Sequence, residues 1–236
     1  MSIDEAALAL SLRRLSLSRE DNGSVISALQ AVLTACVDLF GVAGAGVLIA
    51  DEQDLLRYVA ASDRPGRILE TTEADAGEGP CTEAFVTAQV VASSDVAAET
   101  ERWPTLTRAL ADQPVRAVLG VPVRLGGVPV GTLDVYMDRP HDWDPSEVAA
   151  LTHYAEVIAT TLSAAVQAHT AGEMARQLQF ALDHRVLIER AVGYLMASRS
   201  IDAVAAFNAL RTAARSRRTK INVVAEHVLT TGALPA

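Results

Sequence analysis

Apolar and polar residues follow two different periods along the chain, and these periods predict where helices and strands lie. Residues 25–40 place apolar side chains at helical spacing and are followed by Gly41, a pattern typical of a helix and its C-terminal end. Two short apolar runs flank the polar segment 52–54, and two longer ones flank the glycine pair at 126–127, so each pair predicts a β-hairpin. The segment between the hairpins, 63–114, shows no sustained period, and we expect it to be irregular.

A helical pattern resumes after the second hairpin. Asp144 is a candidate N-cap, Pro145 occupies the first helical position and Glu147 the third, which together predict the start of a long helix. The pattern runs near Gly172 and passes into a second helical stretch, 173–198. We therefore expect a helical rod that joins an N-terminal unit to a C-terminal unit.

The C-terminal unit continues with two shorter helical patterns. Ser200 is the candidate N-cap of the first, whose apolar face comprises Ala203, Ala206, Phe207, Leu210 and Ala214. The second carries apolar residues at i, i+3, i+4 and i+7, namely Ile221, Val224, Ala225 and Val228. With the end of the rod, these patterns predict three helices around one small core.

The rod also carries a heptad-like seam, formed by Leu178, Ala181, Arg185, Ile188, Val192 and Leu195. Two interpretations remain open for this short seam, which Arg185 interrupts. It is either a coiled coil between two copies of the chain, which predicts a homodimer, or an ordinary face of a helix in a bundle.

Composition narrows the class of protein. The 236 residues are half apolar and only 4% aromatic, as in a globular chain with a core of Ala, Val and Leu. Because a domain typically has about 150 residues, a chain of this length favours two units. The N-terminus lacks the basic start of an export signal, no apolar run has the length of a membrane span, and two cysteines are too few for a disulfide framework. We expect a cytoplasmic protein that does not bind membranes.

The net charge of −9 is unevenly divided. Residues 1–171 carry −13 and residues 172–236 carry +4, so a polyanionic partner is expected to meet the C-terminal unit. A basic stripe runs along one face of the predicted middle helix of that unit, formed by Arg211, Arg215 and Arg218 and extended by Arg217 and Lys220. The stripe is either a solvated face or a binding surface. The lack of carboxylates four residues away favours binding.

Gly193 lies in the most regular turn of the rod, where glycine costs roughly 1 kcal/mol of helix stability relative to alanine. One interpretation is close packing of helices, because the small residue Ala197 lies one turn further along; the other is a bound partner. We expect packing. Tyr194 is interpreted as a half-buried tyrosine at an interface, with stacking on a base as the alternative.

The C-terminal unit resembles the ANTAR domain, the three-helix RNA-binding unit of transcription antitermination regulators. The resemblance covers about 50 residues and rests on Arg185, Ala191, Gly193, Leu195, Met196, Ala206, Phe207, Leu210, Arg211, Ala214 and Ala225. It implies that RNA is bound by Arg185, Arg211, Arg215, Arg217, Arg218 and Lys220, whereas Ala191, Gly193 and Tyr194 serve RNA binding or helix packing. The lysine usual before the glycine is Val192 here, which removes a phosphate contact.

The N-terminal unit resembles the GAF domain, an α/β module that senses small molecules or proteins, over residues 22–168. GEGPCTEAFVTAQVVASSDV is similar to that family's middle helix and following strand, and AVLGVPVRLGGVPVGTLDVYM to its closing strand pair. No catalytic set or metal-ligand spacing emerges. Cys81 is expected to be a buried structural cysteine, with a thiol of lowered pKa as the alternative. A phospho-acceptor receiver domain needs a lysine beside its acidic cluster, and the sole lysine, Lys220, lies in the C-terminal unit. We therefore do not expect input by aspartyl phosphorylation within this chain.

The sequence therefore predicts an α+β protein in which a GAF-like α/β sensor domain, an antiparallel sheet flanked by helices, precedes a three-helix ANTAR bundle. We expect an N-terminal extension at 1–21, the GAF-like domain at 22–168 and a helical linker, a possible coiled coil, at 169–182. The ANTAR domain then follows at 183–231 and a tail at 232–236. The predicted function is control by the GAF sensor of ANTAR binding to hairpins in nascent messenger RNA, without enzymatic activity, cofactor or metal. A helix-turn-helix DNA-binding regulator and a GAF-fold redox enzyme are the alternatives.

Overall fold

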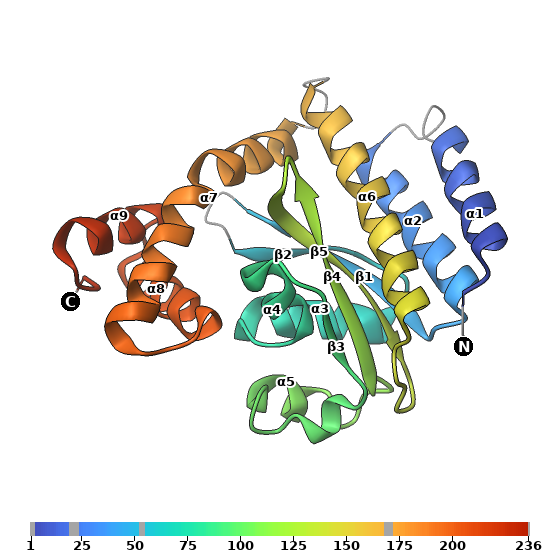
Figure 1. Ribbon diagram of the computed structural model, residues 1–236, viewed down its shortest axis with the longest axis horizontal. Coiled ribbons are helices and arrows are strands. Elements are labelled where there is room, and N and C mark those ends of the chain that lie inside the picture. The colour runs from blue at the N-terminus through green and yellow to red at the C-terminus, as the bar shows by residue number, and fades with distance from the viewer. Residues whose placement is uncertain (1–2, 19–23, 52–54, 168–171, 236) are drawn as a thin grey trace.

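The computed structural model describes most of the chain, namely residues 3–18, 24–51, 55–167 and 172–235, the side chains of 17–18, 166–167 and 172–183 excepted. The N-terminal part contains α1 (Glu5–Ser18), α2 (Val25–Phe40), β1 (Gly44–Ala50), β2 (Leu56–Ala61), α3 (Arg64–Ala76), α4 (Pro80–Thr87), β3 (Val91–Ser93), the 3₁₀ turn η1 (Val96–Ala98), α5 (Pro104–Ala109), β4 (Ala117–Leu125) and β5 (Val128–Met137). The helices that follow are α6 (Pro145–Gln167), α7 (Gly172–Arg199), α8 (Ala203–Arg217) and α9 (Ile221–Thr231) (Figure 1).

Five strands form one antiparallel sheet in the order β2-β1-β5-β4-β3. Both predicted hairpins are confirmed, because β1 pairs with β2 and β4 pairs with β5; the segment 52–54 lies outside the described residues. The pairing of β1 with β5 brings the two hairpins together in one sheet. With the helices on its faces and the helical C-terminal part, this sheet confirms the predicted fold class.

The sheet separates two layers of helices (Figure 1). The face covered by α2 and α6 is here called the back face, and the face covered by α3 and α4 the front face. Side chains of β5 alternate between them, so Leu133 and Val135 join the large apolar core at the back whereas Asp134 lies on the front. The back layer buries an apolar core, and the front layer buries charged groups as well.

The helix starts predicted from the sequence are confirmed in one case and corrected in another. Asp144 accepts hydrogen bonds from the backbone N–H groups of Ser146 at 2.7 Å and Glu147 at 3.2 Å. The Glu147 carboxylate in turn accepts from the N–H of Asp144 at 2.8 Å, which completes a capping box. Ser200 is not the cap of α8, because Asp202 takes that position and accepts a first-turn N–H at 2.7 Å.

The segment 63–114 contains α3, α4, β3 and α5, so the irregular segment expected from the lack of a hydrophobic period is wrong. The middle helix and following strand that the GAF resemblance implied are confirmed as α4 and β3. Local signals mark α3: Asp63 caps its start, Pro65 lies in its first turn, and Gly77 ends it in the left-handed conformation with φ of 73°. The buried face of α3 includes two glutamates. Because that face is not apolar, a search for hydrophobic periods overlooks the helix.

Helices α6 and α7 do not form one straight rod. Figure 1 shows α7 turning away from α6 and running toward the side of α4, and α7 contacts β1 and β5 on its way. Four of the six residues of the heptad-like seam have described side chains, and they pack within the chain: Ile188 is 1% and Leu195 0% exposed, and Val192 is partly buried. A dimer seam is therefore wrong for these four residues, while Leu178 and Ala181 lie outside the described side chains. Among the described helices, none is both long and apolar enough to span a membrane.

Candidate nucleic-acid interface

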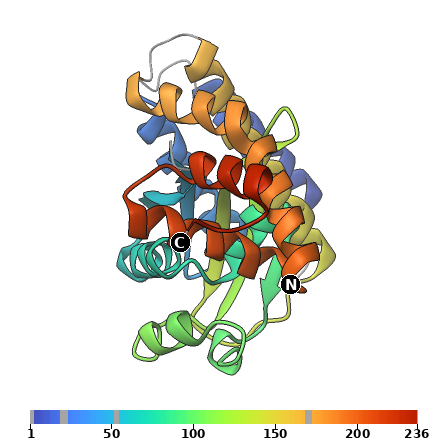
Figure 2. The same ribbon diagram turned by 90° about the vertical axis from the view of Figure 1, so that its left-hand side faces the viewer.

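The C-terminal helices pack against the front layer of the sheet (Figure 2). A single apolar cluster joins side chains of α7, α8 and α9 to Leu48 of β1 and to Cys81 and Phe85 of α4. Phe85 and Phe207 of α8 meet edge to face, with ring centroids 6.2 Å apart. The basic unit is thus docked on the acidic one instead of being held away from it by a rod.

Arg211, which the sequence assigned to RNA, binds the C-terminal end of α3. The last four C=O groups of a helix have no partner within it. In α3 the Gly77 N–H satisfies the carbonyl of Glu73. The Arg211 guanidinium donates to the other three, at Ala74 (2.7 Å), Asp75 (2.8 Å) and Ala76 (3.0 Å). Burial lowers the pKa of Arg211 to about 10, so the side chain keeps its charge at neutral pH and complements the negative end of α3.

Arg185 makes an equivalent contact with α4. This arginine is 2% exposed, and its guanidinium lies 4.4 Å from the ring centroid of Phe85 and donates to the carbonyl of Phe85 at 3.0 Å. That carbonyl belongs to the last turn of α4. Arg185 also binds Glu189 of its own helix at 3.1 Å. We call Arg185 and Arg211 the docked arginines, because each binds the C-terminal end of a front-layer helix.

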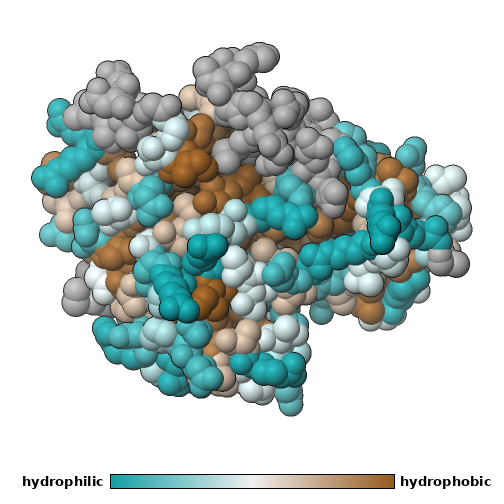
Figure 3. Space-filling view, turned by 180° about the vertical axis from the view of Figure 1, so that it is seen from behind, coloured by the Kyte–Doolittle hydropathy of each residue, from teal (hydrophilic) through white to brown (hydrophobic). Residues whose placement is uncertain are grey.

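Arg217, Arg218 and Lys220, called the exposed cations, lie where α8 ends and α9 begins, and all three are exposed. Arg218 has a left-handed backbone with φ of 51°, which turns the chain from α8 toward α9. Arg215 is intermediate: it is exposed, yet its guanidinium donates to the carbonyl of Asp75 at 3.3 Å. Figure 3 shows hydrophilic side chains gathered over the end of the molecule formed by these helices.

The residues for which the sequence left RNA binding or helix packing open have different surroundings. Ala191 is fully buried in the core of the C-terminal helices. Gly193 is exposed, and a Cβ added there would meet nothing within 4 Å, so the expectation that packing explains this glycine is wrong. Tyr194 is 41% exposed, and its hydroxyl donates to the carbonyl of Gly232 at 3.4 Å. RNA contacts by these residues stay a prediction.

The front layer buries an acidic cluster that no sequence pattern revealed. Glu70 and Glu73 of α3 and Asp134 of β5 are all 0% exposed. Burial, reinforced by the charge of Asp134, raises the pKa of Glu70 and of Glu73 well above the usual range, and burial also raises the pKa of Asp134. Glu73 caps α4 by accepting the N–H groups of Cys81 at 2.8 Å and Thr82 at 3.1 Å.

Cys81 belongs to the same cluster, and its thiol donates to Asp134 at 3.2 Å. Burial, with the negative charge of Asp134 next, raises the pKa of the Cys81 thiol well above its usual range. Cys81 is therefore buried, as expected, and the alternative of a thiol with a lowered pKa is not supported. Cys36 lies in α2, in the core on the back side of the sheet.

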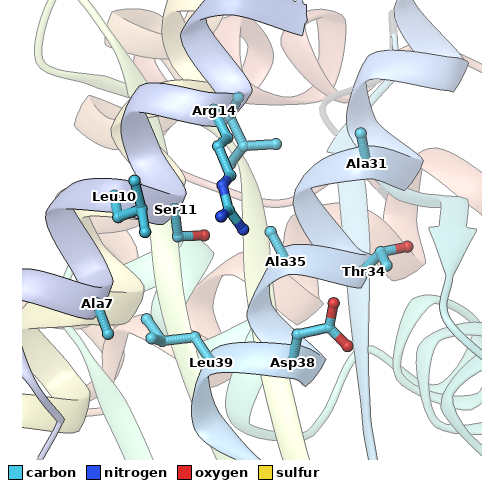
Figure 4. A pocket seen from close by; sticks show the side chains of 10 residues that line it. Ala7, Leu10, Ser11, Arg14, Ala31, Thr34, Ala35, Asp38 and Leu39 are labelled. Carbon is cyan, nitrogen blue, oxygen red and sulfur yellow. The ribbon is translucent and has the colours of Figure 1, made fainter.

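A groove of about 540 Å³ lies between α1 and α2, also on the back side. Figure 4 shows Arg14 of α1 and Asp38 of α2 pointing into the space between the two helices. The groove and the docked arginines are therefore on opposite sides of the sheet (Figure 1).

Comparison with protein-family models assigns both units. Residues 23–163, more than half of the chain, match the GAF domain, and residues 176–229 match the ANTAR domain. This chain is a GAF–ANTAR protein. In the GAF–ANTAR protein the sheet and the acidic cluster lie within the GAF match, whereas the docked arginines and the exposed cations lie within the ANTAR match.

Solved structures are similar to about two thirds of this GAF–ANTAR protein. The GAF domain from an Acinetobacter phosphoenolpyruvate-protein phosphotransferase is 18% identical with a TM-score of 0.55, covering 69% of this chain and 96% of that one. Free methionine-R-sulfoxide reductase from Neisseria meningitidis, solved with its substrate, is 19% identical with a TM-score of 0.56, covering 71% and 96%. At such identities the likeness shows the fold alone. A search of curated proteins finds no match.

Proposed function

We propose that this GAF–ANTAR protein is an RNA-binding regulator of transcription that acts by antitermination. The exposed cations contact a hairpin in nascent messenger RNA, and the GAF domain controls whether the docked arginines join them. One observation carries the proposal: the basic residues of the ANTAR domain fall into two groups. The three exposed cations face solvent, whereas Arg185 and Arg211 are buried against the GAF domain, at 2% and 7% exposure. Arginine suits such a target, because its planar fork binds phosphate bidentately and stacks on unpaired bases.

The docked arginines suggest how the GAF domain exerts control. The carbonyl groups at the C-terminal ends of α3 and α4 carry partial negative charge, as RNA phosphates carry full negative charge. The GAF domain and the RNA therefore compete for the same two guanidinium groups. A signal that alters α3 or α4 shifts this competition only if it binds the docked and undocked arrangements with different affinity.

A variant that loosens the dock without removing a cation tests this control. Phe85→Ala removes the ring that Arg185 covers and that Phe207 meets edge to face. The variant should bind hairpin RNA more tightly, and the slope of log affinity against log salt should steepen by about 0.7 for each arginine that gains a phosphate. Filter binding over a series of salt concentrations measures both quantities.

Phe40→Ala is the matched control, because Phe40 is a buried aromatic residue of the back core that packs against Tyr154. It should leave the salt slope unchanged. If folded Phe85→Ala binds RNA with the affinity and salt slope of the wild type, control by docking is contradicted. If the wild-type chain itself does not bind hairpin RNA, the proposed RNA-binding function is contradicted.

Two simple assays test the alternative functions, DNA binding and redox catalysis. Tighter binding of duplex DNA than of hairpin RNA of the same sequence would favour a DNA-binding regulator. Turnover of oxidised methionine would favour a redox enzyme. The site argues against the enzyme, because burial and nearby carboxylates disfavour the Cys81 thiolate, and Cys36 lies across the sheet.

A further inference from the structure

The acidic cluster brings together two carboxylates and a thiol. One potential ligand atom each from Glu70, Cys81 and Asp134 lies within 4.8 Å of the other two. All three residues are 0% exposed. Buried carboxylates are paired with cations, hold a proton or coordinate a metal, because an isolated buried charge is too costly. A proton shared between Glu70 and Asp134 is one such solution, and it leaves other atoms unexplained.

Buried polar atoms without a hydrogen-bond partner among the described residues gather at this point. A shared proton joins the carboxyl groups of Glu70 and Asp134. Beyond that pair, Oε1 of Glu73 and the hydroxyl of Thr132 have no partner among the described residues. Thr132 is two residues from Asp134 on β5 and therefore lies on the same face of the sheet. A proton shared between two carboxyl groups does not provide a hydrogen-bond partner for the hydroxyl of Thr132. Since buried polar atoms are nearly always satisfied in folded proteins, these atoms favour a bound cation at this point.

The sheet leaves room for the three ligands to converge. Gly46 of β1 and Gly120 of β4 are the residues that pair with Asp134 on its two sides. A Cβ on Gly46 would overlap the carboxylate of Glu70, and one on Gly120 would touch the backbone of Pro80 at 3.4 Å, directly before Cys81. A side chain at position 46 would therefore push Glu70 away from Asp134, which makes the absence of a Cβ there a condition for the cluster.

We propose that Glu70, Cys81 and Asp134 form a binding site for a divalent transition-metal ion of the zinc type. Carboxylate oxygen and thiolate sulfur bind Zn²⁺ at about 2.0–2.3 Å, so ligand atoms as close as these reach one ion after small side-chain movements. Oε1 of Glu73 or a water completes the coordination. The thiolate discriminates against Mg²⁺ and Ca²⁺, which prefer oxygen ligands. Binding releases the thiol proton and the carboxyl protons to solvent, with no change in oxidation state.

The site lies between the two helices that hold the docked arginines. Glu70 belongs to α3, whose last carbonyls bind Arg211, and Cys81 belongs to α4, whose last turn binds Arg185. Ligation would tie both helices to β5 and stabilise the surface on which the ANTAR domain is docked. This consequence rests on the proposed function, whereas metal binding itself does not.

Cobalt substitution tests the site, because Co²⁺ bound to a thiolate absorbs strongly in the near ultraviolet and Co²⁺ bound only to oxygen does not. The full chain is stripped with a chelator and then given Co²⁺ either as the folded protein or during refolding, so that a slowly accessible buried site is also detected. We expect a thiolate band that saturates at about one equivalent and is abolished by Zn²⁺. Zn²⁺ should also raise the melting temperature, and Mg²⁺ should not.

Two cysteine variants provide a matched pair. Cys81→Ser should lose the band and weaken Zn²⁺ binding by at least about 10-fold, as should Asp134→Asn, whereas Cys36→Ser should keep both. Circular dichroism verifies folding. The proposal is overturned if the wild type gives no thiolate band in either arm, if the band persists in folded Cys81→Ser, or if Mg²⁺ stabilises the chain as well as Zn²⁺ does. Each of these results would leave the cluster as a set of protonated acids.

Discussion

The docked arginines and the exposed cations belong to the same domain and look alike in the sequence, but the structure gives them opposite surroundings. Arg211 is 7% exposed and satisfies three carbonyl groups of α3, whereas Arg218, seven residues further along, is exposed at the end of the same helix. The helical period correctly places side chains on a stripe. It does not say which part of the stripe meets a second domain.

The largest expected effect separates the two sets by stability. Arg211→Ala removes a buried cation and leaves three carbonyl groups of α3 without their donor, so the free energy of unfolding should fall by about 2–4 kcal/mol. Arg218→Ala should change it by less than about 0.5 kcal/mol. Urea unfolding monitored by circular dichroism compares the two variants. If both variants lose the same free energy of unfolding, the contacts of Arg211 with α3 add no more stability than an exposed arginine does.

The acidic cluster predicts a pH dependence that the exposed cations do not share. Because the pKa of Glu70 is raised in the folded chain, the folded state keeps a proton that the unfolded state releases above pH of about 4.3. Stability of the metal-free chain should therefore fall as pH rises above about 5, by up to about 1.4 kcal/mol per pH unit for each such group. Glu70→Gln should make this slope smaller, because one of the groups with a raised pKa is removed, and Arg217→Ala should leave it unchanged. Thermal unfolding in the presence of a chelator measures it; an unchanged slope in folded Glu70→Gln would refute the assignment.

Substitution of Gly193, an exposed residue of α7, should change the free energy of unfolding by a smaller amount. Since a Cβ would meet nothing within 4 Å, Gly193→Ala should raise the free energy of unfolding by about 0.5–1 kcal/mol. Ala197→Gly, one turn further at another exposed position, is the matched control and should lower it by a similar amount. Differential scanning calorimetry resolves both shifts. A more stable Gly193→Ala chain with weaker RNA binding would assign this glycine to the RNA surface, and a destabilised chain would show that the site is not open.

Much of the architecture follows from local signals. The glycine pair at 126–127, the capping box at Asp144 and the apolar face of α9 each act within a few residues, and each predicted its element correctly. Two segments, residues 77–96 and the closing strand pair, sufficed to indicate the GAF family, and the residues between Arg185 and Ala225 indicated the ANTAR family. Helix α3 was missed because its buried face carries glutamates, so its period is not hydrophobic.

The candidate sites depend on contacts that sequence periods do not encode. Arg211 binds carbonyls about 135 residues earlier in the chain, and Cys81 meets Asp134 across 53 residues. Only the packing of the ANTAR domain on α3 and the pairing of β5 between β1 and β4 create these neighbourhoods. The direction of α7 was misjudged for the same reason, since the heptad-like spacing does not distinguish a seam between two chains from a face buried within one chain.

The salt dependence of RNA binding by the exposed cations tests the central claim most directly. The full wild-type chain and the triple variant Arg217→Ala, Arg218→Ala, Lys220→Ala are titrated with a hairpin from the chain's own operon leader and with duplex DNA of the same sequence. We predict that the wild type prefers the hairpin, and that the variant, with unchanged helicity, loses affinity and about 0.7 of salt slope for each lost phosphate contact. A variant that binds the hairpin with the affinity and slope of the wild type would contradict the account.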